Sequence, residues 1–274
     1  MSNTKFILDL EDLWPEAFRM AFDIPILSEL FFLPFQIIAN AIYRRSDVIC
    51  AVSQTYVDRA LLVNKKCDHG YAFYLGTELE TFDKNIKKEI SYTKEPEELW
   101  LAYCGTLGTS YDIPCVIDAL ALLNNQNLKF VIMGDGPLRQ DFEKYAQAKK
   151  VNALFTGNLP YDTMCSLLSR CDFTVNPLIK TASQSIINKH ADYAASGLPV
   201  LNTQSCLEYE DLVESYNMGY NVAPSNSEDL AQKLQLLIDN KELRKLMGKN
   251  ARRCAEEKFD RKVTFKKLIA LFDE

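Results

Sequence analysis

The sequence predicts an α/β protein that contains one complete Rossmann-like domain, a doubly wound parallel sheet, and part of a second such domain before it. Strand-like and helix-like segments alternate closely from residue 99 onward, which is typical of βαβ units. Three successive predicted strands in this half end in loops that contain glycine. A chain of 274 residues is also long enough for two ordinary domains.

The N-terminal third has predicted strands but few helices between them. The strands are expected over residues 5–10, 47–52 and 71–75. Ser53 is expected to cap a helix over residues 54–63. Three strands with so few crossovers cannot make a parallel sheet that is covered on both faces. We therefore expect only the second half of a Rossmann-like domain here, followed by a polar linker over residues 83–98.

The rest of the chain alternates regularly. Strands are expected over residues 99–104, 129–133, 153–156, 173–177, 199–202 and 219–222. Helices are expected over residues 114–123, 138–148, 161–169, 188–195, 209–214 and 227–238, with two more before the C-terminus. Such a sheet binds its ligands at the carboxyl ends of its strands.

Composition excludes several functions. A net charge of −6 and a pI near 5.2 leave no broad basic surface for nucleic acid. The eight cysteines include no Cys-x-x-Cys pair and there are only two histidines, so we expect free thiols in the cytoplasm and no metal site. The N-terminus reaches acidic residues before any long apolar run, so no signal peptide is expected.

Residues 24–45 form an apolar stretch with two interpretations. The stretch is rich in Phe, Leu and Ile, is interrupted by Pro25 and Pro34, and ends at Arg44 and Arg45. It is too interrupted to span a membrane. Aromatic side chains beside a basic pair favour peripheral contact with a membrane face. A helix buried against the neighbouring sheet is the alternative.

Glycine-bearing loops follow three successive strands. Gly105 and Gly108 stand between a strand and a helix, where they can bring backbone N–H groups close to an anion. Their spacing fits neither the dinucleotide fingerprint nor the Walker loop, and a tight turn is the alternative. Gly134 and Gly157 follow the next two strands, so we expect all three loops at one edge of the sheet.

The predicted helix that begins at residue 188 carries a polar face. Asn188, Lys189 and Asp192 are three and four residues apart and therefore share one side of the helix. Lys189, near the helix start, can meet a phosphate, and Asp192 can accept hydrogen bonds from ribose hydroxyls. This pairing indicates a nucleotide ligand. The alternative is a surface helix on which Lys189 and Asp192 form a weak ion pair.

Taken in order, these motifs resemble the GT-B glycosyltransferases, specifically the retaining group 1 family (family 4). The segments that carry the resemblance are Asp9–Glu16, Val52–Ser53, Leu75–Glu78, Gly105–Gly108, Gly134–Pro137, Thr156–Gly157 and Asn188–Pro199. The resemblance implies that residues 1–90 are a partial acceptor-side domain with its linker. It implies that residues 91–254 bind the nucleotide sugar and that residues 255–274 form a helix crossing back to the first domain.

The resemblance also implies site residues. Lys189 and Asp192 are the expected catalytic pair: Lys189 meets the diphosphate together with N–H groups of the Gly105 loop, and Asp192 holds the ribose. The expected donor-binding residues are Gly105, Thr106, Gly108, Asn158, Leu159, Gln184, Ser185, Ile186, Ile187 and Asn188. Within this set, Asn158 and Leu159 would contact the base and residues 184–187 the donor sugar.

On the acceptor side, the resemblance suggests that Asp9, Glu11 and Asp12 face the cleft. The alternative for these acids is that they cap a helix beginning at Leu13.

This chain departs from the family pattern in three places. The usual pair of glutamates falls on Gln184 and Asp192, so the first acid is absent and the second is shorter. Thr106 and Ser110 replace the basic residues that often flank the first glycine loop. The chain also opens midway through the family's first domain, so we expect a truncation and a possible partner polypeptide that supplies the missing half. Such a chain would bind the donor but fail to transfer sugar.

The leading hypothesis is a hexosyltransferase-type enzyme that needs no cofactor or metal. It would move a sugar from a nucleoside-diphosphate sugar to a lipid-linked saccharide in the synthesis of capsule, exopolysaccharide or O-antigen. The first alternative is an inactive nucleotide-sugar-binding fragment or regulatory partner. A nucleotide-sugar epimerase of the GT-B fold is the second alternative.

Overall fold

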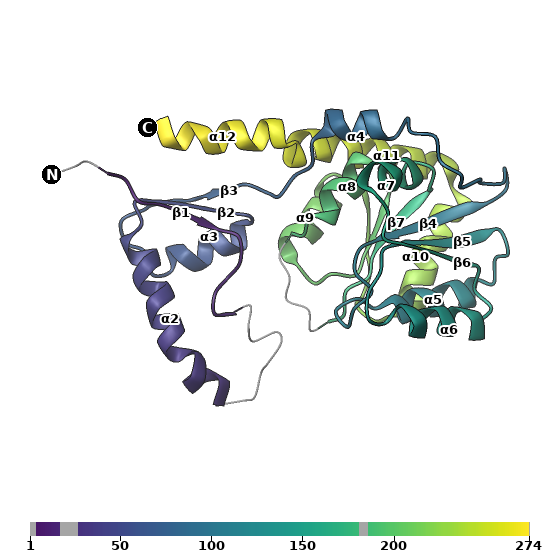
Figure 1. The fold of residues 1–274 in the computed structure, drawn as a ribbon, viewed down its shortest axis with the longest axis horizontal. Coiled ribbons are helices and arrows are strands. Elements are labelled where there is room, and N and C mark those ends of the chain that lie inside the picture. The colour runs from purple at the N-terminus through teal and green to yellow at the C-terminus, as the bar shows by residue number, and fades with distance from the viewer. Residues whose placement is uncertain (1–3, 17–26, 181–185, 274) are drawn as a thin grey trace. The chain divides into compact units, whose positions relative to one another are not determined.

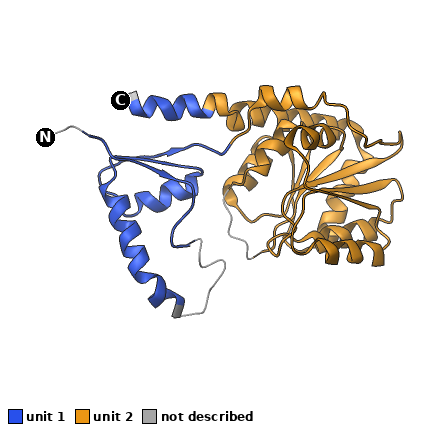
Figure 2. Cartoon of the chain, in the orientation of Figure 1, with its two compact units in different colours: residues 1–75, 264–274 blue, residues 76–263 orange. Residues whose placement is uncertain are grey.

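The computed structural model describes residues 4–16, 27–180 and 186–273, and the chain divides into two compact units (Figures 1 and 2). Unit 1 comprises residues 1–75 and 264–274, and unit 2 comprises residues 76–263. The domain limits expected from the sequence, at residues 90 and 254, stay a prediction. Each unit is described by itself.

Unit 2 is built on a six-stranded parallel sheet with the order β6-β5-β4-β7-β8-β9. Its strands are β4 (Leu99–Cys104), β5 (Leu128–Met133), β6 (Ala153–Gly157), β7 (Phe173–Asn176), β8 (Val200–Asn202) and β9 (Gly219–Asn221). Strand order changes direction between β4 and β7, which is the topological switch of a doubly wound sheet. The predicted fold class is thereby confirmed for this half.

Helices cover both faces of this sheet (Figure 1). They are α4 (Leu79–Asn85), α5 (Ile113–Leu123), α6 (Arg139–Ala148), α7 (Tyr161–Leu168), α8 (Lys189–Ala195), α9 (Leu207–Ser215), α10 (Ser227–Asp239) and α11 (Lys241–Cys254). Helix α5 packs against α6 and α10, while α8 packs against α11 and α4 against α7. The central strand β4 lies between these layers, and Trp100, Leu101 and Tyr103 are almost completely buried.

The register of the sheet brings the glycine loops together. Cys104, at the end of β4, pairs with Met133 at the end of β5, and Met133 pairs with Gly157 at the end of β6. Gly134 in turn forms a bridge with Gly157. The three loops therefore lie side by side at one edge of the sheet, as their positions in the sequence predicted.

The polar segment of residues 83–98, for which a linker is predicted, is hydrogen-bonded to other parts of unit 2. Lys94 Nζ lies 2.5 Å from Asp172 Oδ2, and Ser166 donates to the carbonyl oxygen of Lys88 at 2.6 Å. Arg170 donates to the carbonyl oxygen of Tyr92 at 2.8 Å. These bonds satisfy backbone carbonyl groups of an irregular segment. The predicted linker between domains stays a prediction.

Unit 1 contains a three-stranded parallel sheet with the order β1-β2-β3. Its elements are β1 (Ile7–Leu10), α2 (Leu27–Arg45), β2 (Val48–Ala51), α3 (Gln54–Leu61) and β3 (Tyr71–Ala72). Ser53 caps α3 as predicted, because its hydroxyl accepts from the backbone N–H of Tyr56 at 3.3 Å. A small core around Ile49 and Val57 joins the sheet to α2 and α3.

Helix α2 is only partly covered. Phe32, Ala39 and Tyr43 are buried, and the helix packs against α3. Seven large apolar side chains on the rest of the helix are exposed, namely Leu30, Phe31, Leu33, Phe35, Ile37, Ile38 and Ile42. Burial against the neighbouring elements therefore explains one side of this helix and leaves the other side without a cover among the described residues.

The C-terminal segment joins the two units in sequence. After α11 the chain makes a π-helical turn, η1 (Ala255–Phe259), and continues as α12 (Arg261–Asp273). Both helices expected after residue 238 are therefore present. The N–H of Thr77 donates to the carbonyl oxygen of Phe259 at 2.9 Å, which holds the end of this turn against unit 2.

Candidate nucleotide-sugar site

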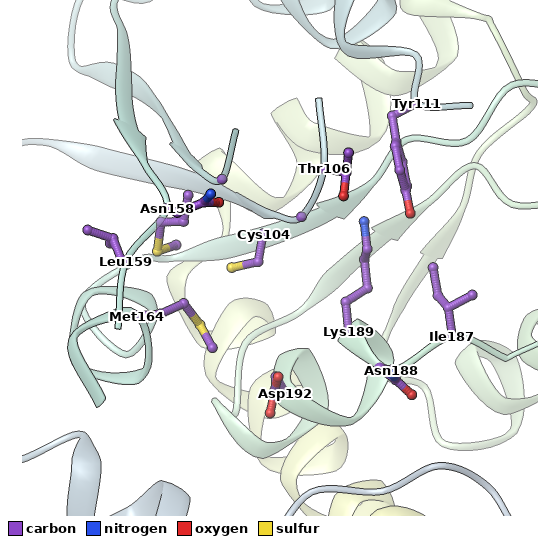
Figure 3. Close-up of a pocket in the computed structure, with 13 residues that line it drawn as sticks. Cys104, Thr106, Tyr111, Asn158, Leu159, Met164, Ile187, Asn188, Lys189 and Asp192 are labelled. Atoms are coloured by element: carbon purple, nitrogen blue, oxygen red, sulfur yellow. The ribbon is translucent and has the colours of Figure 1, made fainter. Parts of the chain in front are cut away.

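A cavity of about 470 Å³ opens at the carboxyl ends of β4, β5 and β6 beside the start of α8 (Figure 3). This volume lies within the range of roughly 300–1,000 Å³ that is usual for small-molecule sites. The residues that line the cavity are Cys104, Gly105, Thr106, Tyr111, Met133, Gly134, Asn158, Leu159, Met164, Ile187, Asn188, Lys189 and Asp192.

Two glycines allow the backbone to form one wall of the cavity. Gly105 has a φ of +144° and Gly134 a φ of +154°. Residues that carry a side chain rarely adopt these backbone angles. A Cβ atom on Gly134 would lie only 1.9 Å from the carbonyl oxygen of Gly105. On Gly105 a Cβ atom would lie 2.8 Å from Lys189 Nζ. Glycine is thus required for the loops to pack on each other and for Lys189 to reach the backbone.

The first glycine loop has fewer free donors than its sequence suggested. The N–H of Gly105 donates to the carbonyl oxygen of Met133 at 2.9 Å, and the N–H of Leu107 donates to the carbonyl oxygen of Asp135 at 2.9 Å. These bonds hold the loops after β4 and β5 together. The N–H groups of Gly105 and Leu107 are therefore engaged within the protein, and Lys189 and the remaining N–H groups of this loop stay the predicted partners of a diphosphate.

Lys189 is a buried cation that faces the cavity. Its Nζ atom is inaccessible to solvent and has no hydrogen-bond partner among the described residues. It lies 3.9 Å from the centre of the Tyr111 ring and 4.4 Å from that of Tyr103, and Figure 3 shows it pointing from α8 toward Thr106 and Tyr111. Burial lowers the pKa of Lys189 from 10.5 to about 7, against a smaller opposing effect of Cys104. An unpaired charge in such a place is costly, and an anion in the cavity would offset that cost.

Asp192 lines the same cavity one helical turn from Lys189. Tyr161 donates its hydroxyl to Asp192 Oδ1 at 2.8 Å, and Thr77 Oγ1 lies 2.7 Å from the Tyr161 hydroxyl. Burial raises the pKa of Asp192, and the hydroxyls of Tyr161 and Thr77 and the charge of Arg261 oppose that rise. The Tyr161 hydroxyl keeps its proton because burial also raises the pKa of Tyr161. No Lys189–Asp192 ion pair forms, so the surface-helix alternative does not hold.

A buried polar network fixes α8 beneath the cavity. The His190 ring stacks on Tyr209 with centroids 3.5 Å apart, and its Nδ1 accepts from the N–H of Ile187 at 3.3 Å. Burial, with help from the charge of Lys189, lowers the pKa of His190 well below its usual value. Tyr193 accepts from the N–H of Cys104 at 2.8 Å. The helix is therefore held to the sheet by groups that flank Lys189 and Asp192.

The predicted site residues are placed as follows. Those that line the cavity are Gly105, Thr106, Asn158, Leu159, Ile187, Asn188, Lys189 and Asp192. Gly108 lies in the loop away from the lining, and Ile186 is buried in the core. Gln184 and Ser185 lie outside the described residues. The roles of these residues in donor binding stay predictions.

The acids proposed for the acceptor side belong to unit 1. Asp9 is in β1, and Glu11 and Asp12 follow that strand; all three are exposed. Although the residue as a whole is exposed, its carboxylate is partly desolvated, which together with the nearby charge of Glu11 raises the pKa of Asp9. Leu13 is not helical, and residues 17–26 lie outside the described part of the chain, so the capping alternative is not supported at Leu13.

Sequence reasoning missed several residues of the cavity. Tyr111, Met133 and Met164 also line the cavity, and Tyr161 donates a hydrogen bond to Asp192. An aromatic residue shortly after the Gly105 loop was a visible signal for Tyr111. Nothing local signals the contact of Tyr161, because this residue begins helix α7, 31 residues before Asp192 in the sequence.

The described residues show neither a metal site nor a spanning helix. Across residues 4–16, 27–180 and 186–273, no three His, Cys, Asp or Glu side chains gather where they could hold a metal ion. Within the same ranges, no helix is both long enough and apolar enough to cross a membrane.

Comparison with known proteins identifies the class. Residues 84–254 match the family model described as glycosyl transferases group 1, so the chain belongs to this family. It is 26% identical over 225 residues, 82% of its length, to an uncharacterized glycosyltransferase of Methanocaldococcus jannaschii, and covers 57% of that protein. It is also 26% identical to the sulfoquinovosyl transferase of Arabidopsis thaliana. The matched 191 residues are 68% of this chain and 36% of that protein. The chain thus spans about half the length of the curated relatives it matches.

Solved structures agree on the fold. The match to the UDP complex of Anabaena HepE covers 98% of this chain and 72% of the HepE chain, with a TM-score of 0.79 and 18% identity. WaaG, a glycosyltransferase of lipopolysaccharide biosynthesis, matches 95% of this chain and 73% of its own, with a TM-score of 0.68 and 18% identity. Both likenesses concern the fold, and they confirm the GT-B type predicted from the motif order.

Proposed function

We propose that this chain is a retaining, metal-independent glycosyltransferase of hexosyl type that uses a nucleoside-diphosphate sugar. The observation that carries the proposal is the buried Nζ of Lys189, which faces a cavity of ligand size and has no described partner. Membership of the group 1 family supports the transferase class. The nucleotide is suggested by Anabaena HepE, a protein of the same fold that was crystallised with UDP and with UDP-glucose.

In the proposed reaction, the bond between the sugar C1 and the diphosphate oxygen breaks while an acceptor oxygen bonds to C1 on the same face. Lys189 would hold the negative charge that develops on the leaving diphosphate. The acceptor's proton would pass to that diphosphate, so no side-chain base is required. Asp192 would accept from the ribose hydroxyls, with Asn158 and Leu159 beside the base and residues 184–187 beside the sugar.

The acceptor proposed is a lipid-linked saccharide in the synthesis of capsule, exopolysaccharide or O-antigen. Asp9, Glu11 and Asp12 are proposed to face this acceptor. Residues 24–45 are proposed to make peripheral contact with the cytoplasmic face of a membrane, where a lipid-linked acceptor would be held. The exposed apolar side chains of α2 support this contact.

The proposal is tested by calorimetry with UDP, GDP and their sugars, followed by product analysis on membranes that carry lipid-linked saccharide. We expect donor binding that survives EDTA, since protein donors would meet the phosphate charge, whereas transfer would require both the acceptor and the proposed partner polypeptide. Binding without turnover even when both are supplied would favour the nucleotide-sugar-binding alternative. A change in donor stereochemistry without acceptor would indicate an epimerase. Loss of binding on chelation, restored by Mg²⁺, would overturn the metal-independent scheme.

A further inference from the structure

A second hollow, of about 450 Å³, lies in unit 1 at the C-terminal end of α2. It is lined by Arg44, Leu62, Val63, Lys65 and Lys66. Three of these five side chains are cationic, in a chain whose net charge is −6. The hollow is therefore a local positive region on an acidic protein.

Most of its positive charge is not neutralised. Lys66 Nζ lies 3.2 Å from Asp47 Oδ1 and donates to the carbonyl oxygen of Arg45 at 3.0 Å. The side chains of Arg44 and Lys65 form no hydrogen bond or ion pair with a described residue. The dipole of α2 favours a cation in its last turn, which explains the position of Arg44. It does not explain Lys65, which lies outside this helix. Charge thus remains for an external anion.

The hollow borders an apolar surface. Leu62 is 72% exposed on its wall, and the apolar surface continues along α2 away from the hollow through Ile37, which is 58% exposed, to Leu30, which is 73% exposed. A helix that is apolar on nearly all sides is normally buried or in contact with lipid. Arg44 follows Ile37 by seven residues, so it lies on the same outward side of α2 as that apolar surface.

We propose that the Arg44–Lys65–Lys66 hollow binds the phosphate headgroup of an anionic phospholipid while the outward side of α2 lies in the membrane interface. Apolar and cationic groups side by side match an anionic bilayer, which offers acyl chains beneath phosphates. The only acidic residue of α2 is Glu29, in its first turn and far from the hollow. A symmetric dimer through this side would instead bring two copies of the same cations into one interface.

This proposal extends the membrane contact proposed above to a particular headgroup site, and its test requires neither donor nor acceptor. Vesicles of phosphatidylcholine alone, or mixed with phosphatidylglycerol, are floated with the full chain at low and high salt. We expect binding to the anionic vesicles only, weakened by salt. Arg44→Gln/Lys65→Gln should reduce that binding about 30-fold, since each basic residue near an anionic surface contributes roughly fivefold.

Two further variants separate the explanations. Lys144→Gln/Lys241→Gln removes the same charge from exposed positions on unit 2 and should leave vesicle binding unchanged. Ile37→Ser should weaken binding to anionic vesicles without changing its dependence on salt. Equal binding to both vesicle types would overturn the proposal, as would glycerol phosphate binding in the hollow without vesicle binding. Light scattering that shows a dimer through α2, broken by Ile37→Ser, would also overturn it.

Discussion

Helices α5 and α2 show how differently the two units treat an apolar helix. Helix α5 buries Ile113, Val116 and Ile117 because α6 and α10 pack on it above a six-stranded sheet. Helix α2 is also rich in large apolar residues, yet within the described part of the chain it packs on one short helix above three strands and leaves seven of them exposed. The number of neighbouring elements, and not the composition of the helix, decides whether such a surface is buried.

The same contrast holds for polar groups. In unit 2 an unpaired buried cation, Lys189, faces a cavity, where it is available to a ligand. In unit 1 the cations of the hollow are at the surface beside apolar side chains. Unit 2 thus encloses its unpaired cation beside a packed cavity, whereas the cations of unit 1 lie on an exposed surface. The predictions below test each side of this comparison.

The largest effect is expected where unit 2 is packed most closely. Gly134→Val places a side chain against the carbonyl oxygen of Gly105 and should lower the free energy of unfolding by about 3 kcal/mol or more. Ile37→Ser in unit 1 should change it by only about 0.5 kcal/mol, because the side chain is exposed. Urea unfolding measures both. A large loss in Ile37→Ser would show that α2 is covered after all.

A control distinguishes strain from mere substitution of a loop glycine. A Cβ atom on Gly108 would meet only Thr106 Cγ2, at 3.8 Å, which is ordinary contact. Gly108→Ala should therefore leave stability nearly unchanged. If it cost as much as Gly134→Val, the close approach of the two loops would not be the cause.

Replacing Lys189 should separate binding from stability. Lys189→Met should weaken UDP binding by about 1.5–3 kcal/mol, the usual size of a charge-assisted hydrogen bond. The same change should raise the free energy of unfolding by about 1–4 kcal/mol near pH 7, because it removes an unpaired buried charge. Calorimetry and urea unfolding measure the two effects, with Lys144→Met on the exposed surface as control. A variant that loses stability and keeps its affinity would contradict the assignment.

How much of this was predictable is clearest around β4. Its strand and the glycine loops at its end followed from local periodicity and loop composition, and the order of the βα units put those loops at one edge. The desolvation of Lys189 did not follow, because it depends on Tyr103 and Tyr111 from another part of the chain. The contacts of residues 83–98 did not follow either, since partners distant in sequence such as Asp172 decide where a polar segment lies.

The pH dependence of unfolding should identify the same lysine. Its folded-state pKa of about 7 lies below the 10.5 of the unfolded chain, so the unfolded state binds more protons between these values. This residue therefore contributes a stability that rises with pH across that window, by up to a few kcal/mol. The difference in unfolding free energy between Lys189→Met and the parent chain should shrink accordingly from pH 7 to pH 10. A constant difference would mean that Lys189 is not desolvated.

The smallest effect is expected from Tyr161, which contacts the cavity only through Asp192. Tyr161→Phe removes one hydrogen bond to the carboxylate and should weaken UDP binding by about 0.5–1.5 kcal/mol. If Asp192 holds the ribose, the variant should also bind UDP and 2′-deoxy-UDP more equally than the parent chain does. Tyr145→Phe is a matched control, because Tyr145 donates to Asp118 at 2.8 Å on another part of unit 2. An equal loss for both nucleotides would assign Tyr161 to the packing of α7 and remove it from ribose recognition.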